Sequence, residues 1–172
     1  MLQRTNSKDY ARLGIKDLIK VISVEFHIGI RENFATLNLN LETAHKLEPH
    51  GEELEFAWAT LKTMEEKLKE HIQKEEQFLF PVFSIARKRM KEDGESINLE
   101  MFIDSLKGEH LWLKKQLLQI QTITNHYKCE PTYTPSHKLA FALLNDLEQN
   151  LNKMFYVEEL FLFPLALKIQ NK

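Results

Sequence analysis

Glycine and proline are both scarce in this chain, with five of each among 172 residues. Because these two residues are the strongest breakers of regular structure, their scarcity indicates a few long elements, and long elements are usually helices. Hydrophobic residues make up 43% and charged residues 28%, which is typical of a globular protein with one core. We therefore predict a single domain over 1–172, with a helical bundle over about 15–170 and an N-terminal extension over 1–14.

The chain also has little cysteine, little net charge and no long apolar run. Its one cysteine, Cys129, excludes an internal disulfide and favours a reducing, cytoplasmic location. The formal net charge is −2 and no basic run is present, so nucleic acid is not a predicted partner. Apolar runs such as 160–163 are far shorter than the ~20 residues of a spanning helix. The polar start of the chain lacks a signal-peptide core. We predict no membrane association.

Apolar residues recur at spacings of three and four, which predicts amphipathic helices. The expected helices cover about 15–41, 52–91, 98–126 and 136–169. Pro81 and Pro164 fall inside the second and fourth helices and should kink them, because proline lacks an N–H and crowds the preceding turn. Ser136 is the expected N-cap of the fourth helix. The fold class is therefore all-α, an up-down-up-down four-helix bundle.

An internal repeat relates the two halves of the chain. Residues 75–81 read EEQFLFP and residues 158–164 read EELFLFP, identical at six of seven positions and offset by 158 − 75 = 83. The same offset carries His27 to residue 110, which is also a histidine. The chain is interpreted as two helical hairpins related by an approximate two-fold axis. Residues 78–80 and their counterparts are expected to pack inside the bundle.

Five polar side chains lie midway along the predicted helices on apolar stripes. They are His27, His71, Glu75, His110 and Glu158. His71 and Glu75 are four residues apart and share a helix face. A bound cation would offset the cost of burying these groups, and imidazole with carboxylate suits iron or manganese. Two carboxylates in pseudo-symmetric positions could bridge two metals about 3.5–4 Å apart.

Each of these residues has a simpler reading when taken alone. A single histidine on an apolar face is often a hydrogen-bonded core residue, and His71 with Glu75 could be a surface pair. The shared register of the repeat favours a common metal site instead. The other histidines were weaker candidates and are predicted to lie at the surface: His45, His50, His126 and His137.

Together these residues resemble the hemerythrin-like (HHE cation-binding) family. The matching residues are His27, the His71–Glu76 segment followed by Phe78–Pro81, the Glu109-His110 pair, and Glu158-Glu159 with Phe163-Pro164. The resemblance implies a four-helix bundle with a non-haem di-iron centre. It also implies a role in binding oxygen, in sensing oxygen or iron, or in repairing damaged iron–sulfur centres.

One position departs from this pattern. The repeat predicts a histidine at 71 + 83 = 154, and the residue there is Met154, a soft thioether that suits iron poorly beside carboxylates. Water or an exogenous ligand could complete an asymmetric di-iron site. Alternatively, the second metal could be weak or absent, or metal binding could be lost. A missing protein ligand would open a coordination position to O₂, NO or peroxide.

Three functions follow from this reading. The leading hypothesis is a non-enzymatic iron protein, with two Fe per chain, that binds or senses O₂ or NO or handles iron. The second is a di-iron redox or repair enzyme acting on peroxide, NO or damaged iron–sulfur centres. The absence of cysteine from the N-terminal segment disfavours this second reading, because the family's repair members carry a cysteine-bearing module there. The third is a metal-free helical interaction protein.

Overall fold

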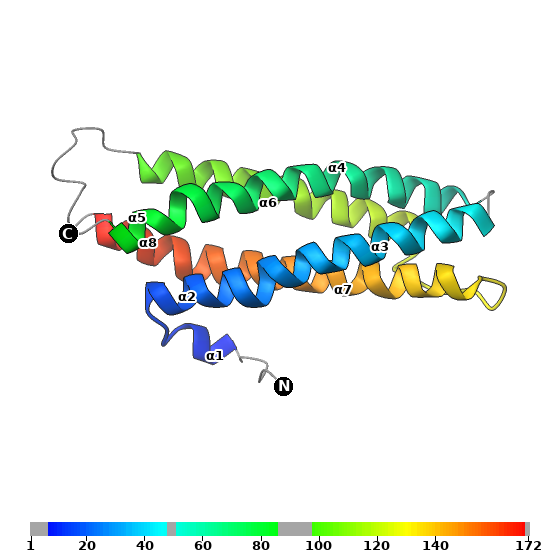
Figure 1. Ribbon diagram of the computed structural model, residues 1–172, viewed down its shortest axis with the longest axis horizontal. Helices are drawn as coiled ribbons and strands as arrows, with labels where there is room; N and C mark the ends of the chain where they lie inside the picture. Colours follow the sequence, from blue (N-terminus) through cyan, green and yellow to red (C-terminus); the bar gives the residue numbers. More distant parts are fainter. Residues whose placement is uncertain (1–6, 48–50, 86–97, 171–172) are drawn as a thin grey trace.

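The computed structural model describes residues 7–47, 51–85 and 98–170, and these residues form an all-α bundle of four long antiparallel rods (Figure 1). A short helix, α1 (Ser7–Tyr10), precedes the bundle. The first rod joins α2 (Ile15–Val21), the π-helix η1 (Ile22–His27) and α3 (Ile28–Leu47). The second joins α4 (Glu52–Lys74), η2 (Glu75–Leu79) and α5 (Phe80–Ile85). The third is α6 (Leu99–Ile123), and the fourth joins α7 (Pro135–Val157), η3 (Glu158–Leu162) and α8 (Phe163–Gln170).

The rods are arranged as the sequence predicts for an up-down-up-down bundle. Helix α3 packs against α4 and α7, and α6 packs against the same two helices from the other side. Each rod turns one apolar stripe inward, as in α4, where Leu61, Met64 and Leu68 are at most 1% exposed. Burial of these stripes supplies most of the stability of such helices, since isolated helices of this length are marginal in water.

Three of the predicted helix ends are wrong by a few residues. The first rod continues to Leu47 and does not end near residue 41. Helix α7 begins at Pro135, with Thr134 and not Ser136 as N-cap, because the Thr134 hydroxyl accepts from the His137 N–H at 3.2 Å. Proline suits the first helical position, where its missing N–H would be unpaired in any case. Helix α6 ends at Ile123 and not at His126, because residues 125–127 all have positive φ angles of 46°, 58° and 60°.

The two internal prolines follow π-helical turns. Pro81 and Pro164 are each the second residue of the α-helical segment that begins after η2 or η3. In the first turn of a segment the absent proline N–H is tolerated, so a wider turn just before it relieves the conflict. The end of the second predicted helix near residue 91 lies outside the described residues.

Several burial predictions need correction. Phe78 is 54% exposed and lies against Phe102 at the surface, whereas its neighbours Leu79 and Phe80 are buried as predicted. His137 was predicted at the surface but is completely buried, with its ring stacked on Tyr133 at 3.8 Å. Both changes arise from the angular positions of the side chains, which shift when a π turn or a revised helix start alters the register.

The other weak histidine candidates lie away from the bundle centre. His126 is exposed, and His45 is half-buried with its ring centroid 5.8 Å from that of Trp58. His50 lies outside the described residues. The N-terminal extension returns to the bundle, since Tyr10 is 1% exposed and packs against Phe161. Within the described residues, no helix is both long enough and apolar enough to cross a membrane.

Candidate metal centre

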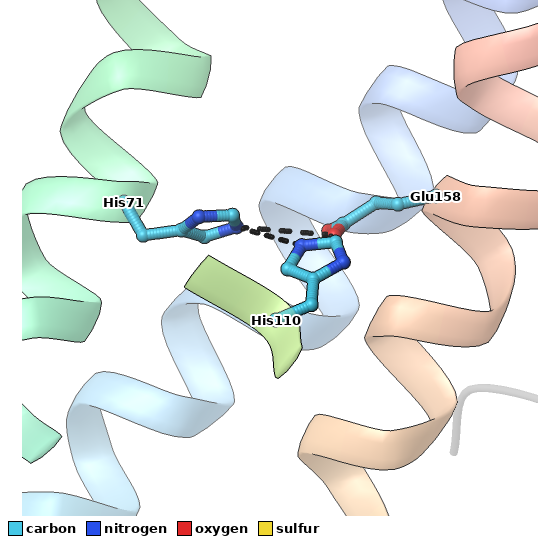
Figure 2. Close-up of side chains that lie close together, drawn as sticks. All are labelled: His71, His110 and Glu158. Atoms are coloured by element: carbon cyan, nitrogen blue, oxygen red, sulfur yellow. Dashed lines mark hydrogen bonds and ion pairs between the residues drawn. The ribbon is translucent and has the colours of Figure 1, made fainter. Parts of the chain in front are cut away.

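The five residues singled out by the repeat converge at one point in the core. His71, His110 and Glu158 form one group of potential ligands, and His27, Glu75 and Glu158 form a second. Within each group the ligand atoms all lie within 4.8 Å of one another, and all five side chains are 0% exposed. Figure 2 shows His71, His110 and Glu158 pointing toward one another from three different rods. Glu158 belongs to both groups and could therefore bridge two ions.

Three of the five inward-facing residues lie at the ends of π turns. His27 is the last residue of η1, while Glu75 and Glu158 are the first residues of η2 and η3. A π turn inserts one extra residue into a helix, which changes the angular position of the side chains that follow it. In the first, second and fourth rods the local distortion thus coincides with a potential ligand, whereas α6 presents His110 from a regular α-helix. π turns are frequent at functional sites.

The contacts inside the centre are short. The Nε2 atom of His27 lies 3.1 Å from Glu75 Oε2, and Nε2 of His110 lies 3.0 Å from Glu158 Oε2. The Nε2 atoms of His71 and His110 are only 3.2 Å apart. His71 Nε2 also lies 3.7 Å from Glu75 Oε2 and 3.9 Å from Glu158 Oε2. Three imidazoles and two carboxylates therefore aim their ligand atoms at a common volume.

Each histidine also holds an outer carboxylate through its other ring nitrogen. His27 Nδ1 lies 2.9 Å from Glu76 Oε1, and His110 Nδ1 lies 2.8 Å from Glu159 Oε1. His71 Nδ1 lies 2.9 Å from Glu109 Oε2. Because an ionised carboxylate only accepts, Nδ1 carries the proton in all three rings.

A surface cation completes each of these chains. Arg31 Nη2 donates to Glu76 Oε2 at 2.9 Å, and Lys114 Nζ donates to Glu159 Oε1 at 2.9 Å. Lys74 donates to Glu109 in the same way. We call these three cation–carboxylate–imidazole sets relays, each named by its histidine. The relays fix the ring orientations, so that every Nε2 lone pair points at the centre.

Sequence reasoning did not assign these outer carboxylates a role. Glu76 and Glu159 could have been found, because each half of the repeat has a second glutamate directly after the predicted ligand. Glu109 carried no such signal, since its repeat counterpart, at 109 − 83 = 26, is a phenylalanine.

Comparison with known proteins bears directly on this geometry. A family model described as "Hemerythrin HHE cation binding domain" matches residues 22–166, which span all five inward-facing residues. The chain belongs to the hemerythrin HHE cation-binding family. The family resemblance seen in the sequence is thereby confirmed, as is the helical-bundle fold.

Named bacterial proteins match most of the chain. The chain is 25% identical over 166 residues to proteins named "Iron-sulfur cluster repair protein YtfE" from Yersinia pseudotuberculosis and from Yersinia pestis. The match covers 95% of this chain and 71% of each relative.

Protonation of the hemerythrin-type centre follows from its crowding. Burial lowers the pKa of His71, but the charge of Glu75 and the contact with Glu109 outweigh burial and raise it to about 10. The pKa of His27 is also raised, because its hydrogen bond to Glu75 outweighs burial. Burial, reinforced by the nearby charge of Glu158, raises the pKa of Glu75. The pKa of Glu158 is lowered despite burial, because His110 and His71 stabilise its charge.

These groups fit a bound cation on chemical grounds. Oε1 of Glu75 and Oε1 of Glu158 are buried without a hydrogen-bond partner among the described residues, while Oε2 of Glu158 has the close contact with His110 Nε2 described above. Buried acceptors in that state cost free energy unless a cation or proton satisfies them. The Nε2 lone pairs of His71 and His110 likewise face each other at 3.2 Å, which is favourable only with a proton or a cation nearby. In the metal-free protein, protons on His71, His27 and Glu75 help to satisfy these acceptors, and a bound cation would take the place of those protons.

The place of the missing histidine is apolar as a whole. The His71 relay consists of His71, Lys74 and Glu109, and the 83-residue offset maps these onto Met154, Val157 and Phe26. All three counterparts are buried, at 0%, 0% and 4% exposure. Helix α7 and η1, which carry them, pack against each other. The second hairpin thus has apolar residues at all three positions that correspond to the ligand, the outer carboxylate and the surface cation of the His71 relay.

Proposed function

We propose that this chain holds two iron ions at the centre and binds a small diatomic ligand, O₂ or NO, at the side lined by Met154. His71, His110 and Glu158 would hold one ion, while His27, Glu75 and Glu158 would hold the other. Nitrogen and oxygen ligands without thiolate suit iron, and the Yersinia relatives are named for iron–sulfur cluster repair. The single observation that carries the two-ion proposal is that the fully buried carboxylate of Glu158 belongs to both ligand groups.

The residues around the centre would set its properties. The three relays hold the imidazoles in one tautomer and one orientation. Phe80 stacks against His27, and Phe155 and Phe163 stack against His110, which keeps bulk water away. On the fourth side, Met154, Phe26 and Val157 offer neither a ligand nor a hydrogen bond. A di-iron centre with one open side would supply reversible ligand binding or redox chemistry. An apolar open side favours a neutral diatomic over a charged molecule.

A repair or redox activity is the second candidate. It is favoured by the printed name of the relatives and by the extent of the match, 95% of this chain. Because the identity is only 25% and the match covers 71% of each relative, the activity in the relatives' name does not transfer directly. Steady-state consumption of peroxide or NO by the iron-loaded protein would favour this candidate over simple binding. We place the protein in a reducing cytoplasm, in keeping with its free, exposed Cys129.

Metal content and an optical spectrum test the proposal. Full-length protein expressed with ample iron should contain close to two iron ions per chain, and its near-ultraviolet spectrum should change with O₂ or NO. Loss of a hydrogen-bond partner outside the metal ligands typically lowers metal affinity by about 10–100-fold. His71→Ala removes a ligand itself and should lower metal affinity by more than that. His45→Ala is the matched control, since it removes a half-buried histidine outside both groups.

Metal content also distinguishes the proposed iron protein from a metal-free helical interaction protein. Folded protein that carries less than about one-tenth of a metal ion per chain at every metal tried would leave a metal-free interaction protein. One ion per chain, lost in His71→Ala but kept in His27→Ala, would restrict the proposal to the His71–His110–Glu158 group.

A further inference from the structure

A small cavity opens between α3 and α4, close to the centre. Its volume is about 50 Å³, and its floor is formed by Ile30, Phe34, Leu68 and Ile72, each at most 3% exposed. Its mouth is lined by Arg31, Glu65 and Lys69. We call it the Ile72 cavity. The polar mouth faces the outer surface of the two rods, which run side by side in Figure 1.

The two hairpins differ in the side chains that line this cavity. The 83-residue offset carries the four floor residues Ile30, Phe34, Leu68 and Ile72 onto Leu113, Leu117, Leu151 and Phe155. Phe155 stacks on His110 with ring centroids 4.2 Å apart, so its ring occupies the corresponding space in the second hairpin. Ile72 is smaller and lacks an aromatic ring, which leaves the space beside the first hairpin unfilled. The cavity therefore lies at a place where the repeat is asymmetric, with isoleucine in the first hairpin and an aromatic ring in the second.

The cavity lies next to the His27 side of the centre. Ile30 stands three residues after His27, and Leu68 stands three residues before His71, so these two floor residues are each about one helical turn from a potential ligand. At the mouth, Arg31 belongs to the His27 relay through its hydrogen bond to Glu76. The repeat relates the group of His27 and Glu75 to the group of His110 and Glu158. In the first of these groups, the position that corresponds to His71 is occupied by Met154.

The size and lining of the cavity select its occupant. About 50 Å³ is far below the about 300–1,000 Å³ of a drug-sized site but above the about 10–15 Å³ needed for one water. Its floor residues carry no hydrogen-bonding side chains. An ion there would lose its hydration without compensation, and water is disfavoured for the same reason. A small uncharged molecule loses little hydration and fits.

We propose that the Ile72 cavity is the binding and access site through which a small uncharged diatomic molecule reaches the His27 side of the centre. Occupancy of the cavity depends only on its shape and lining. The onward step to the metal rests on the proposed function above. O₂ and NO share the required size and lack of charge, and xenon is a probe for both.

Xenon binding to the full-length protein tests occupancy without any dependence on metal. A xenon-pressurised crystal should show a xenon atom among Ile30, Leu68 and Ile72. Ile72→Phe should abolish it, because the new ring imitates Phe155. Ile72→Leu, which conserves volume, is the matched control and should keep it. Phe155→Ile should open a second xenon site at the equivalent place. If Ile72→Phe does not fold, Leu68→Phe fills the floor from another side. If the pressurised wild-type crystal shows no xenon density in the cavity, the proposal is overturned.

Stopped-flow association of NO with the iron-loaded protein tests access. Ile72→Phe should slow association by about tenfold or more relative to Ile72→Leu, at equal metal content. Xenon in the cavity combined with equal association rates in these two variants overturns the access role. Failure of the proposed function has a different signature: the wild-type chain would contain no iron, while the xenon experiment would still decide occupancy of the cavity.

Discussion

Replacing Met154 with histidine is the sharpest test of how this centre is built. Position 154 is where the repeat expects the fourth histidine, yet the outer carboxylate and cation that would orient it are replaced by Phe26 and Val157. Met154→His would therefore bury an imidazole whose Nδ1–H has no acceptor. Phe26→Glu would restore a carboxylate at the position equivalent to Glu109. Lys153 is near enough to pair with it, since its Nζ lies 5.7 Å from the Phe26 ring centroid.

The expected magnitudes follow from burial. Met154 is 0% exposed, so an unpaired imidazole N–H there should destabilise the metal-free protein by about 1–3 kcal/mol. For a chain of this size, that lowers the melting temperature by roughly 2–12 °C. Phe26→Glu alone leaves a poorly paired buried charge and should cost about 3–5 kcal/mol. In the double variant the two new groups pair, so a double-mutant cycle should give a favourable coupling of about 0.5–3 kcal/mol.

Urea unfolding of the metal-free protein and competition with a chelator measure both effects. Metal affinity should rise in the Phe26→Glu/Met154→His double variant and change little in Met154→His alone. An equal rise in both variants would show that the outer carboxylate is dispensable. Unchanged affinity in the double variant, with both proteins folded, would show that position 154 does not face the metals.

The remaining predictions concern the relays, pH and the loop after α6. Glu109→Gln should weaken metal binding by about 10–100-fold in chelator competition, because it leaves His71 without its outer carboxylate. The control Glu100→Gln changes an exposed glutamate on the same helix and should leave metal affinity unchanged. Because the pKa values of His71 and His27 are raised in the metal-free protein, their protons must leave when metal binds. Apparent affinity should therefore climb with pH by about tenfold per unit for each proton released, up to about pH 10, and a flat titration by calorimetry would contradict this. Tyr127→Phe removes a 2.5 Å hydrogen bond to Glu148 and should cost about 0.5–3 kcal/mol in urea unfolding, with loss of the raised tyrosine pKa seen by ultraviolet titration.

Much of the centre could be read from local spacing. A repeat of fixed offset places related residues at equivalent points of two hairpins, so His27 with His110, and Glu75 with Glu158, could be paired before any fold was known. The structure brings these four and His71 into two adjoining groups. Helix positions followed from the 3.6-residue period, and their errors fell at ends set by capping, as at Thr134 and Ile123.

Other features depend on contacts between distant segments. The partner of His71 is Glu109, 38 residues away on another rod, and no repeat or spacing marks that pair. Exposure of Phe78 and burial of His137 depend on angular shifts that a uniform helical period does not contain.

The sequence by itself determined the number of helices, the family and the inward-facing histidines and glutamates, because periodicity and repetition are local properties of the chain. Only the tertiary structure decided which imidazole pairs with which carboxylate, that the wall at Met154 extends to Phe26, and that a cavity lies beside Ile72. These depend on how side chains from separate rods fill the same volume, and that volume is defined only once the rods have packed.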